Sequence, residues 1–546
     1  MRTPRPSLVV SGQIVVAARP DGLETAEAIG IADGIVVMTG SEDEVRSAAA
    51  PGARLIEAGS SAVVPGLHDF HLHLVGMARA RRIVDLEGGR SMDDVVAAIG
   101  SAAAAAPSDS WVRGDGWHTE VLAPSQLDRL EAVLDGRPAL LRSHDRHSAW
   151  ASGSALRAAG TAPDAADPPG GRFERDAAGR LNGLLRESAA DLIVDAAPRL
   201  VGEPLNDAFG EVAAELAGLG ITRATDAGDP TTANGHGQYA ALGDSFANLS
   251  DARAVFDGSL GVTLNLPADG IDAAAGMGLR TGQPVADGAA MRVGWAKLFA
   301  DGALGSRTAA LFEPYTCGER DDDRGMLRIG ADELDDLVGR SRRAGIGLAV
   351  HAIGDRAVSE ALDAVARGRA RSDDQPPDRI EHAQLVRQAD RVRFATLGVT
   401  ASLQPIHLPS DRKAAEECWA GRLEDAYAYR SVAATGALLA FGSDAPIETV
   451  NPWHGVYAAV RRAATGVASA PWTPEETLTP ETALWAYTLG PALAAGRRDL
   501  GHLRPGAWAD LAVLNIDLPT LLEADERLAS VRSQLTLLGG REVRRG

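Results

Sequence analysis

Eight short apolar runs, each typical of a buried β-strand, recur between residues 62 and 443 of this 546-residue chain. Helical segments such as 333–345 and 355–368 separate them. Strands that alternate with helices indicate a parallel α/β architecture, and eight such units are what a (β/α)8 barrel requires. The expected strands are 62–71, 220–226, 262–267, 292–299, 346–351, 379–383, 399–404 and 438–443. The sequence therefore predicts a TIM-like barrel of the α/β class.

Two parts of the chain depart from this alternation. Residues 1–61 and 497–546 carry short β-type runs joined by Gly, Asp and Pro turns, and we expect them to meet in one small β domain. The barrel would then occupy residues 62–496. Residues 85–200 combine an alanine-rich helix with Trp-, Gly- and Pro-rich loops. We expect this segment to be an insertion after the first barrel strand that lies over the barrel mouth as a lid.

The composition excludes several classes of partner. A net charge of −20 and a pI near 5.1 argue against binding to nucleic acid or to an anionic membrane. No apolar run reaches membrane-spanning length, and no secretory signal is apparent. We expect a soluble cytoplasmic protein with a small-molecule substrate, and a homodimer stays open. Cys317 and Cys418 form no CxxC motif, so we expect neither a disulfide framework nor a zinc–thiolate site.

Five of the eight expected strands end in residues that can bind metals. The first strand carries two histidines at i and i+2, whose side chains point to the same side of a strand. The carboxyl ends of barrel strands form one face, so these side chains should converge. Imidazole and oxygen ligands suit several divalent metals. The candidate ligands are His71, His73, Lys297, His351, His382 and Asp444.

Each candidate also has an ordinary structural explanation. An HxH pair occurs by chance on many strands, a single histidine is more often a hydrogen-bonded structural residue, and Asp444 could cap the following helix. Only two of the 54 basic residues are lysines, Lys297 and Lys413. A buried lysine can lose its proton and take up carbon dioxide as a carbamate, an anionic metal ligand, whereas arginine cannot. The other explanation is a surface ammonium, which we expect for Lys413.

The motifs together resemble the amidohydrolase superfamily, and specifically amidohydrolase family 3. The motifs are the run from Lys297 to Ala309 (KLFADGALGSRTA), His351-Ala-Ile-Gly-Asp355, Gly116-Trp117 and His144-Asp-Arg-His147. They are similar to those of N-substituted formamide deformylases. The resemblance covers essentially the whole chain and implies a metal-dependent hydrolase, with a small β-sandwich formed from both termini.

The resemblance also implies a role for each ligand. His71 and His73 would bind the more buried metal with Asp444, and carbamylated Lys297 would bridge to a second metal held by His351 and His382. Zn²⁺ is the expected metal, as one or two ions. A metal-activated hydroxide would attack an amide-type carbon, and Asp444 would act as general base and then as general acid. The expected substrate is a small N-substituted formamide or N-acyl compound.

Several assignments remain open at this point. The same site could hydrolyse a lactone, carbamate or dipeptide, since specificity lies in loops. A deaminase ranks lower because no glutamate follows His351, and a non-catalytic binding barrel ranks lowest. The remaining histidines, His407 among them, are expected to be mostly structural or surface residues. The tentative substrate contacts, each with a structural alternative, are Trp117, His144, His147, Asp301 and Arg307.

Overall fold

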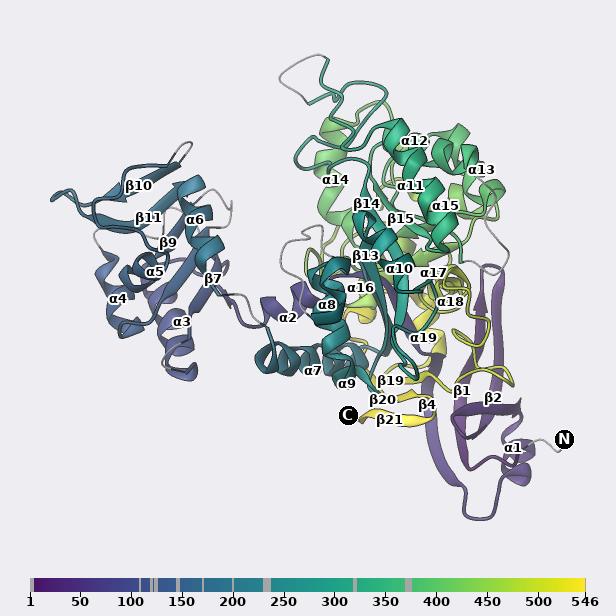
Figure 1. The fold of residues 1–546 in the computed structure, drawn as a ribbon. Coiled ribbons are helices and arrows are strands. Elements are labelled where there is room, and N and C mark those ends of the chain that lie inside the picture. Colours follow the sequence, from purple (N-terminus) through teal and green to yellow (C-terminus); the bar gives the residue numbers. More distant parts are fainter. Residues whose placement is uncertain are drawn as a thin grey trace. The chain divides into compact units, whose positions relative to one another are not determined.

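The eight predicted barrel strands form one sheet in the computed structural model of the chain (Figure 1). Its order is β18-β17-β16-β15-β14-β13-β12-β5, and every pair of neighbours is parallel. The backbone N–H of Asp444, just beyond β18, donates to the carbonyl of His71 in β5 at 2.7 Å, which nearly closes the barrel. The α/β barrel fold is therefore confirmed. The strands are β5 (Leu67–Leu72), β12 (Ile221–Asp226), β13 (Gly261–Pro267), β14 (Arg292–Phe299), β15 (Leu348–Ala352), β16 (Arg379–His382), β17 (Thr400–Leu403) and β18 (Leu439–Phe441).

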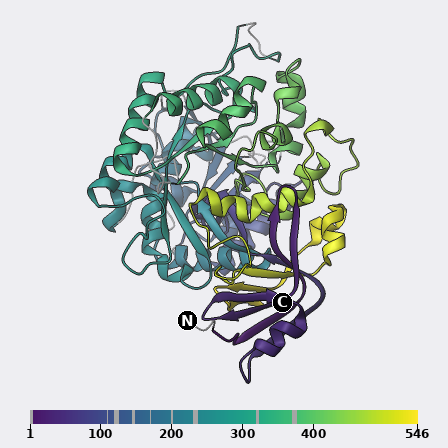
Figure 2. The same ribbon diagram turned by 90° about the vertical axis from the view of Figure 1, so that its right-hand side faces the viewer.

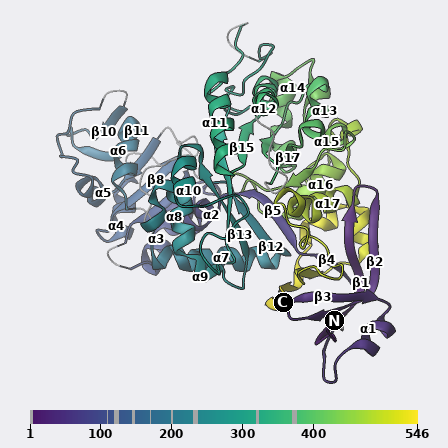
Figure 3. The ribbon, with the colours of Figure 1, turned by 45° about the vertical axis from the view of Figure 1, so that its right-hand side comes forward.

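Helices follow the barrel strands along the chain and lie outside them, as α11, α12 and α13 do around β15 in Figure 3. The amphipathic pattern explains this placement, because α12 buries Ala357, Val358, Ala361 and Leu362 while its other face stays polar. The helices are α7 (Glu203–Gly218), α8 (Asp244–Asp251), α9 (Arg253–Phe256), α10 (Ile271–Gly276), α11 (Ala331–Ala344), α12 (Asp355–Arg367), α13 (Gln388–Leu397), α14 (His407–Cys418), α15 (Tyr429–Ala433), α16 (Pro452–Arg461), α17 (Pro480–Tyr487) and α18 (Leu489–Ala494).

Both ends of the chain build one seven-stranded sheet, in the order β21-β20-β19-β4-β1-β2-β3. Figures 1 and 2 show the purple N-terminal strands beside the yellow C-terminal ones, and the β4–β19 pairing joins the two sets. The two ends of the chain therefore pair in one sheet, as expected, and this sheet belongs to the same compact unit as the barrel. Its elements are β1 (Leu8–Arg19), β2 (Gly22–Ala32), β3 (Ile35–Gly40), α1 (Glu42–Ala48), β4 (Arg54–Pro65), β19 (Leu511–Leu514), α19 (Leu518–Glu523), β20 (Ser533–Leu538) and β21 (Arg541–Arg545).

The chain divides into two compact units, Met1–Met77 with Phe209–Gly546, and Ala78–Ala208. The second unit has its own six-stranded sheet, in the order β10-β11-β9-β8-β7-β6, and its own apolar core. Helix α2 (Leu74–Ala80) leads into it. Its elements are β6 (Val84–Asp85), α3 (Met92–Ala105), β7 (Val112–Trp117), α4 (Asp128–Leu134), β8 (Ala139–Ser143), β9 (Ser148–Ala151), α5 (Gly153–Ala158), β10 (Gly171–Arg175), β11 (Leu181–Glu187) and α6 (Ser188–Ala196).

The structure describes most of the chain. The described residues are 4–107, 110–117, 121, 126–143, 148–168, 171–198, 201–228, 237–317, 322–368 and 376–545. Among them, no helix combines the length and apolar character that crossing a membrane requires.

A disulfide joins Cys317 to Cys418, so the expectation that the two cysteines form no disulfide was wrong. Cys317 lies in the loop that follows β14, and Cys418 is the last residue of α14, which follows β17. Their sequence separation of 101 hides their proximity, because segments that follow parallel barrel strands return to the same end of the barrel. Beside the bond, the Thr316 N–H donates to the Cys418 carbonyl at 3.0 Å.

Candidate metal centre

Four histidines from three barrel strands meet at the carboxyl ends of those strands. His71 and His73 lie at the end of β5, His351 lies in β15, and His382 is the last residue of β16. The ring centroids of His71 and His382 are 5.0 Å apart, and those of His382 and His351 are 4.6 Å apart. His73 follows His71 at 5.7 Å. The predicted convergence of these imidazoles is therefore present in the folded chain.

Asp444 joins this cluster from the segment after β18. Its Oδ1 lies 3.1 Å from Nε2 of His73 and 3.4 Å from Nε2 of His71. One ligand atom each from His71, His382 and Asp444 lie within 4.8 Å of one another. Burial alone would raise the pKa of Asp444, but hydrogen bonds from His407, His71 and His73 outweigh it and hold the pKa well below its ordinary value. Asp444 is thus a carboxylate, the form that binds metals.

Neighbouring groups orient the two β5 histidines through their Nδ1 atoms. His71 Nδ1 donates to Glu381 Oε2 at 2.5 Å, and His73 Nδ1 donates to the Gly228 carbonyl at 3.1 Å. Glu381 is itself paired with Arg379. Such contacts set the tautomer of a ligating histidine and leave Nε2 for the metal. Both Nε2 atoms lie on the side of Asp444.

His351 and His382 are neutral imidazoles. Burial, aided by the charge of Lys297, lowers the pKa of His351 to about 3, and burial lowers the pKa of His382 well below its ordinary value. His351 Nε2 donates to the Gly302 carbonyl at 2.9 Å, so its Nδ1 is the nitrogen that can bind a metal. His382 Nδ1 is buried and has no hydrogen-bond partner in the described part of the chain. An unpaired buried nitrogen is costly unless a ligand satisfies it, so this donor set fits a divalent metal.

The backbone at the strand ends is held in unusual conformations. His382, Ala383 and Asp444 have φ values of 70°, 42° and 58°, in the left-handed region that non-glycine residues rarely adopt. Such conformations cost about 1–3 kcal/mol each and cluster at functional sites. A Cβ at Gly442 would lie 2.4 Å from the His71 nitrogen, so a glycine is needed there for β18 to approach β5. These backbone conformations lower the stability of the fold and orient the side chains of the site.

Lys297 lies within β14 and is buried, with 5% of its surface exposed. Among the described residues its ammonium makes no hydrogen bond or ion pair, and its Nζ lies 5.1 Å from the centroid of the Phe299 ring. Burial lowers the pKa of Lys297 to about 8, although Glu381 and Asp444 favour the charged form. A surface ammonium, the ordinary alternative for this residue, is therefore ruled out. Lys413 is exposed, as expected.

The tentative substrate contacts have differing surroundings. Asp301 is fully buried: Oδ1 accepts from the Ile353 N–H at 3.0 Å, and Oδ2 accepts from Gly354 at 2.8 Å and Ala310 at 2.9 Å. Arg307 is exposed in the loop after β14.

The other three tentative substrate contacts, Trp117, His144 and His147, belong to the insertion. Trp117 ends β7 and packs in the apolar core of the second unit, where its indole N–H has no partner among the residues that the structure describes. His144 and His147 lie outside the described residues.

His407 is a site residue that the sequence reasoning missed. It opens α14, is buried, and its Nε2 donates to Oδ2 of Asp444 at 3.1 Å. Its Nδ1 lies 3.6 Å from Glu448. The available signal was its position four residues after β17, since every barrel strand end faces the same centre. The sequence analysis instead grouped it with the structural and surface histidines.

Comparisons with known proteins agree with this geometry. Residues 54–544 match the model of the amidohydrolase family. The chain is 30% identical to amidohydrolase YtcJ of Bacillus subtilis, covering 95% of this chain and 96% of that protein. It is 29% identical to the N-substituted formamide deformylase of Arthrobacter pascens, covering 90% of each chain.

A solved structure is similar over nearly the same length. An uncharacterised metal-dependent hydrolase from Pyrococcus horikoshii is 25% identical, with a TM-score of 0.74 over 93% of this chain and 97% of that one. The family match spans the barrel and the β4, β19, β20 and β21 strands of the terminal sheet, and it includes every candidate ligand. The chain therefore belongs to the amidohydrolase family and is a metal-dependent hydrolase.

Proposed function

We propose that this protein hydrolyses the amide-type C–N bond of a small N-substituted formamide or another small N-acyl compound. The observation that carries the proposal is the meeting of ligand atoms from His71, His382 and Asp444 within 4.8 Å. The similarity to an N-substituted formamide deformylase over 90% of both chains supports this substrate class. Membership of the family supports a metal-dependent reaction, and the substrate panel described below tests which acyl group is cleaved.

The candidate ligands divide into two groups, each of which would hold one metal ion. His71, His73 and Asp444 would hold one divalent ion, for which we propose Zn²⁺. His351 and His382 would hold a second, with Lys297 as a bridging carbamate. The carbamate forms when the neutral Lys297 amine adds carbon dioxide and releases one proton. When bound, the metal supplies a Lewis acid for the substrate carbonyl and a water of lowered pKa.

Asp444 would move the proton during hydrolysis. Its Oδ1 is the oxygen on the histidine side, and its Oδ2 is held by the N–H of His407. The carboxylate would accept a proton from the attacking water and return it to the leaving nitrogen as the C–N bond breaks. The products are a carboxylic acid and an amine.

The loop after β14 would contribute positioning and substrate contact. Both carboxylate oxygens of Asp301 accept backbone N–H groups, so we propose that Asp301 fixes the segment after His351 rather than reaching the substrate. Arg307 is exposed and stays a proposed substrate contact.

A matched substrate panel tests the proposal. The metal-loaded enzyme would be assayed with the N-formyl and N-acetyl derivatives of one amine, a lactone, a carbamate and a dipeptide. We expect kcat/KM to be highest for one of the N-acyl amines, by about tenfold or more, which corresponds to about 1.4 kcal/mol of transition-state discrimination. The Asp444→Asn protein, purified identically, controls for contaminating hydrolases. Preference for the lactone or dipeptide would replace the proposed substrate class.

A further inference from the structure

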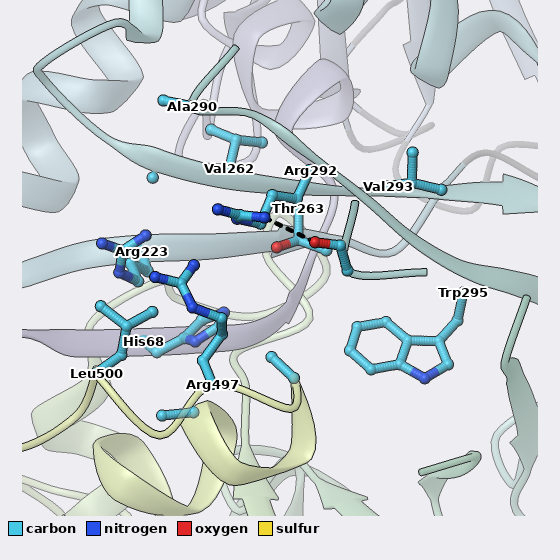
Figure 4. A pocket seen from close by; sticks show the side chains of 14 residues that line it. His68, Arg223, Val262, Thr263, Ala290, Arg292, Val293, Trp295, Arg497 and Leu500 are labelled. Carbon is cyan, nitrogen blue, oxygen red and sulfur yellow. Dashed lines mark hydrogen bonds between the residues drawn. The ribbon is translucent and has the colours of Figure 1, made fainter. Parts of the chain in front are cut away.

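A small cavity lies at the amino-terminal ends of the barrel strands, opposite the ends that carry the histidines. It is bordered by the first residues of β13 and β14, by His68 of β5, and by the segment after α18 (Figure 4). Its volume is about 20 Å³. A cavity needs roughly 10–15 Å³ on this measure to hold one water-sized sphere. The space therefore suits one or two small atoms rather than an organic ligand.

Three guanidinium groups line this cavity. Arg223 of β12, Arg292 of β14 and Arg497 beyond α18 turn their charged ends toward the same space in Figure 4. His68 stands beside them as a neutral ring, because burial and then the charges of Arg223 and Arg379 lower its pKa well below the ordinary value. Three positive charges in so small a volume repel one another unless anions compensate them.

Carboxylates compensate two of the three charges. Arg223 donates to Asp510 Oδ2 through Nη2 at 2.7 Å and through Nε at 3.0 Å. Arg497 makes a two-pronged contact with Asp499, with both hydrogen bonds at 2.7 Å. These pairs satisfy the geometry that guanidinium prefers. The two carboxylates therefore leave one positive charge over.

Arg292 carries that remaining charge. Among the described residues, its guanidinium makes one hydrogen bond, from Nη1 to the Gly282 carbonyl at 2.7 Å, and no ion pair. Burial, followed by repulsion from Arg497 and Arg223, lowers the pKa of Arg292. A partly buried arginine beside two others is normally paired. Asp499 favours the charged form of Arg292, but it is paired with Arg497 and makes no ion pair with Arg292.

We propose that the cavity binds one small monovalent inorganic anion, of the size of chloride, against Arg292. The small cavity suits a small anion, and the single uncompensated charge matches a monovalent one. The site lies at the end of the barrel where residues stabilise the fold rather than act in catalysis. Because Arg223 and Asp510 join barrel strand β12 to the segment before β19, the anion would stabilise the junction of barrel and terminal sheet.

The first test compares melting temperatures in sodium chloride and sodium gluconate at equal ionic strength. A ligand that binds only the folded state raises the melting temperature, here by about 2–4 °C in chloride. In Arg292→Gln the difference between the two salts should vanish, and its melting temperature in gluconate should equal or exceed that of the wild type, because a repulsive charge is gone. Arg367→Gln, which removes an exposed guanidinium paired with Asp335, should keep the difference.

The outcomes separate an anion site from a purely structural arginine. Equal melting temperatures of the wild type in the two salts would overturn the proposal, as would an Arg292→Gln variant that retains the chloride effect. If Arg292→Gln does not fold, the proposal is tested instead by anomalous diffraction from wild-type crystals soaked in bromide. An anomalous peak beside Arg292 supports the site, and bromide bound only elsewhere refutes it.

Discussion

Lys297 places a primary amine among imidazoles and carboxylates, at a depth where an unmodified ammonium finds no partner among the described residues. Lys297→Arg keeps the positive charge but cannot form a carbamate. We expect the variant to lose at least one metal ion per chain and to lose about 10³-fold or more in kcat, in the range that metal chemistry contributes. Elemental analysis and kinetics on the same sample measure both effects.

Lys413→Arg is the matched control, because it makes the same change at the other lysine, which is exposed. It should behave as the wild type. Full metal content and near-normal turnover in Lys297→Arg would show that Lys297 serves only to support the fold.

Substitutions of Asp444 and His407 should differ in how far they lower kcat, while both keep most of the metal. Asp444→Asn keeps an oxygen near the metal but loses the base, so we expect most of the metal to remain while kcat falls by about 10²–10⁴. His407→Asn removes the hydrogen bond that holds Oδ2 and the contact with Glu448, and we expect a smaller fall of about 10–100-fold, with metal retained. Metal analysis with kinetics distinguishes the two. Equal loss of metal in both variants would contradict the separate roles.

The pKa of Lys297 sets a pH dependence for assembling the centre. Its pKa is lowered to about 8, so the neutral amine that reacts with carbon dioxide increases as pH rises through about 8 and then levels off. From pH 6.5 to pH 8 the neutral fraction grows roughly 15-fold. We expect the rate at which the metal-free enzyme regains activity, at constant dissolved carbon dioxide, to follow this curve. A rate still climbing at pH 10 would indicate an ordinary lysine.

At the scale of elements, local patterns predicted the barrel strands well because each strand is a short apolar run with a turn signal on either side. One boundary was misplaced. The predicted strand 62–71 contains the end of β4 and most of β5, which break at Gly66, whose N–H donates to the carbonyl of Asp510. That partner lies more than 400 residues away, so no local pattern could indicate the break.

Because local patterns do not indicate contacts between distant residues, only part of the site could be predicted from the sequence. The candidate ligands lie at strand ends, which the chain order reveals. The groups that orient them come from other strands, as Glu381 of β16 does for His71 of β5 across 310 residues. Pairings of this kind depend on the three-dimensional register of neighbouring strands, and a single sequence carries no sign of it.

The Cys317–Cys418 disulfide ties the loop after β14 to the end of α14, so its removal should lower stability without touching the ligands. We expect the double variant Cys317→Ser/Cys418→Ser to unfold with about 2–4 kcal/mol less free energy. Thermal melting measures the loss, and reduced wild type should melt with the variant. Two thiols that react in the native protein without reductant would contradict the bond.

At the scale of the whole molecule, the terminal sheet and the barrel form one compact unit, and the insertion forms another. The candidate metal ligands all belong to the first unit, where hydrogen bonds between distant segments close the barrel and link it to the terminal sheet. Because the ligands come from separate strands, the centre exists only in the folded barrel. Metal binding and folding should therefore stabilise each other.

The most direct test of this account follows metal content and hydrolysis together in the wild-type protein. We expect the isolated enzyme to contain about two divalent ions per chain, a chelator to remove metal and activity in parallel, and Zn²⁺ with bicarbonate to restore both. Hydrolysis of the preferred substrate that continues after complete removal of metal would contradict the central claim.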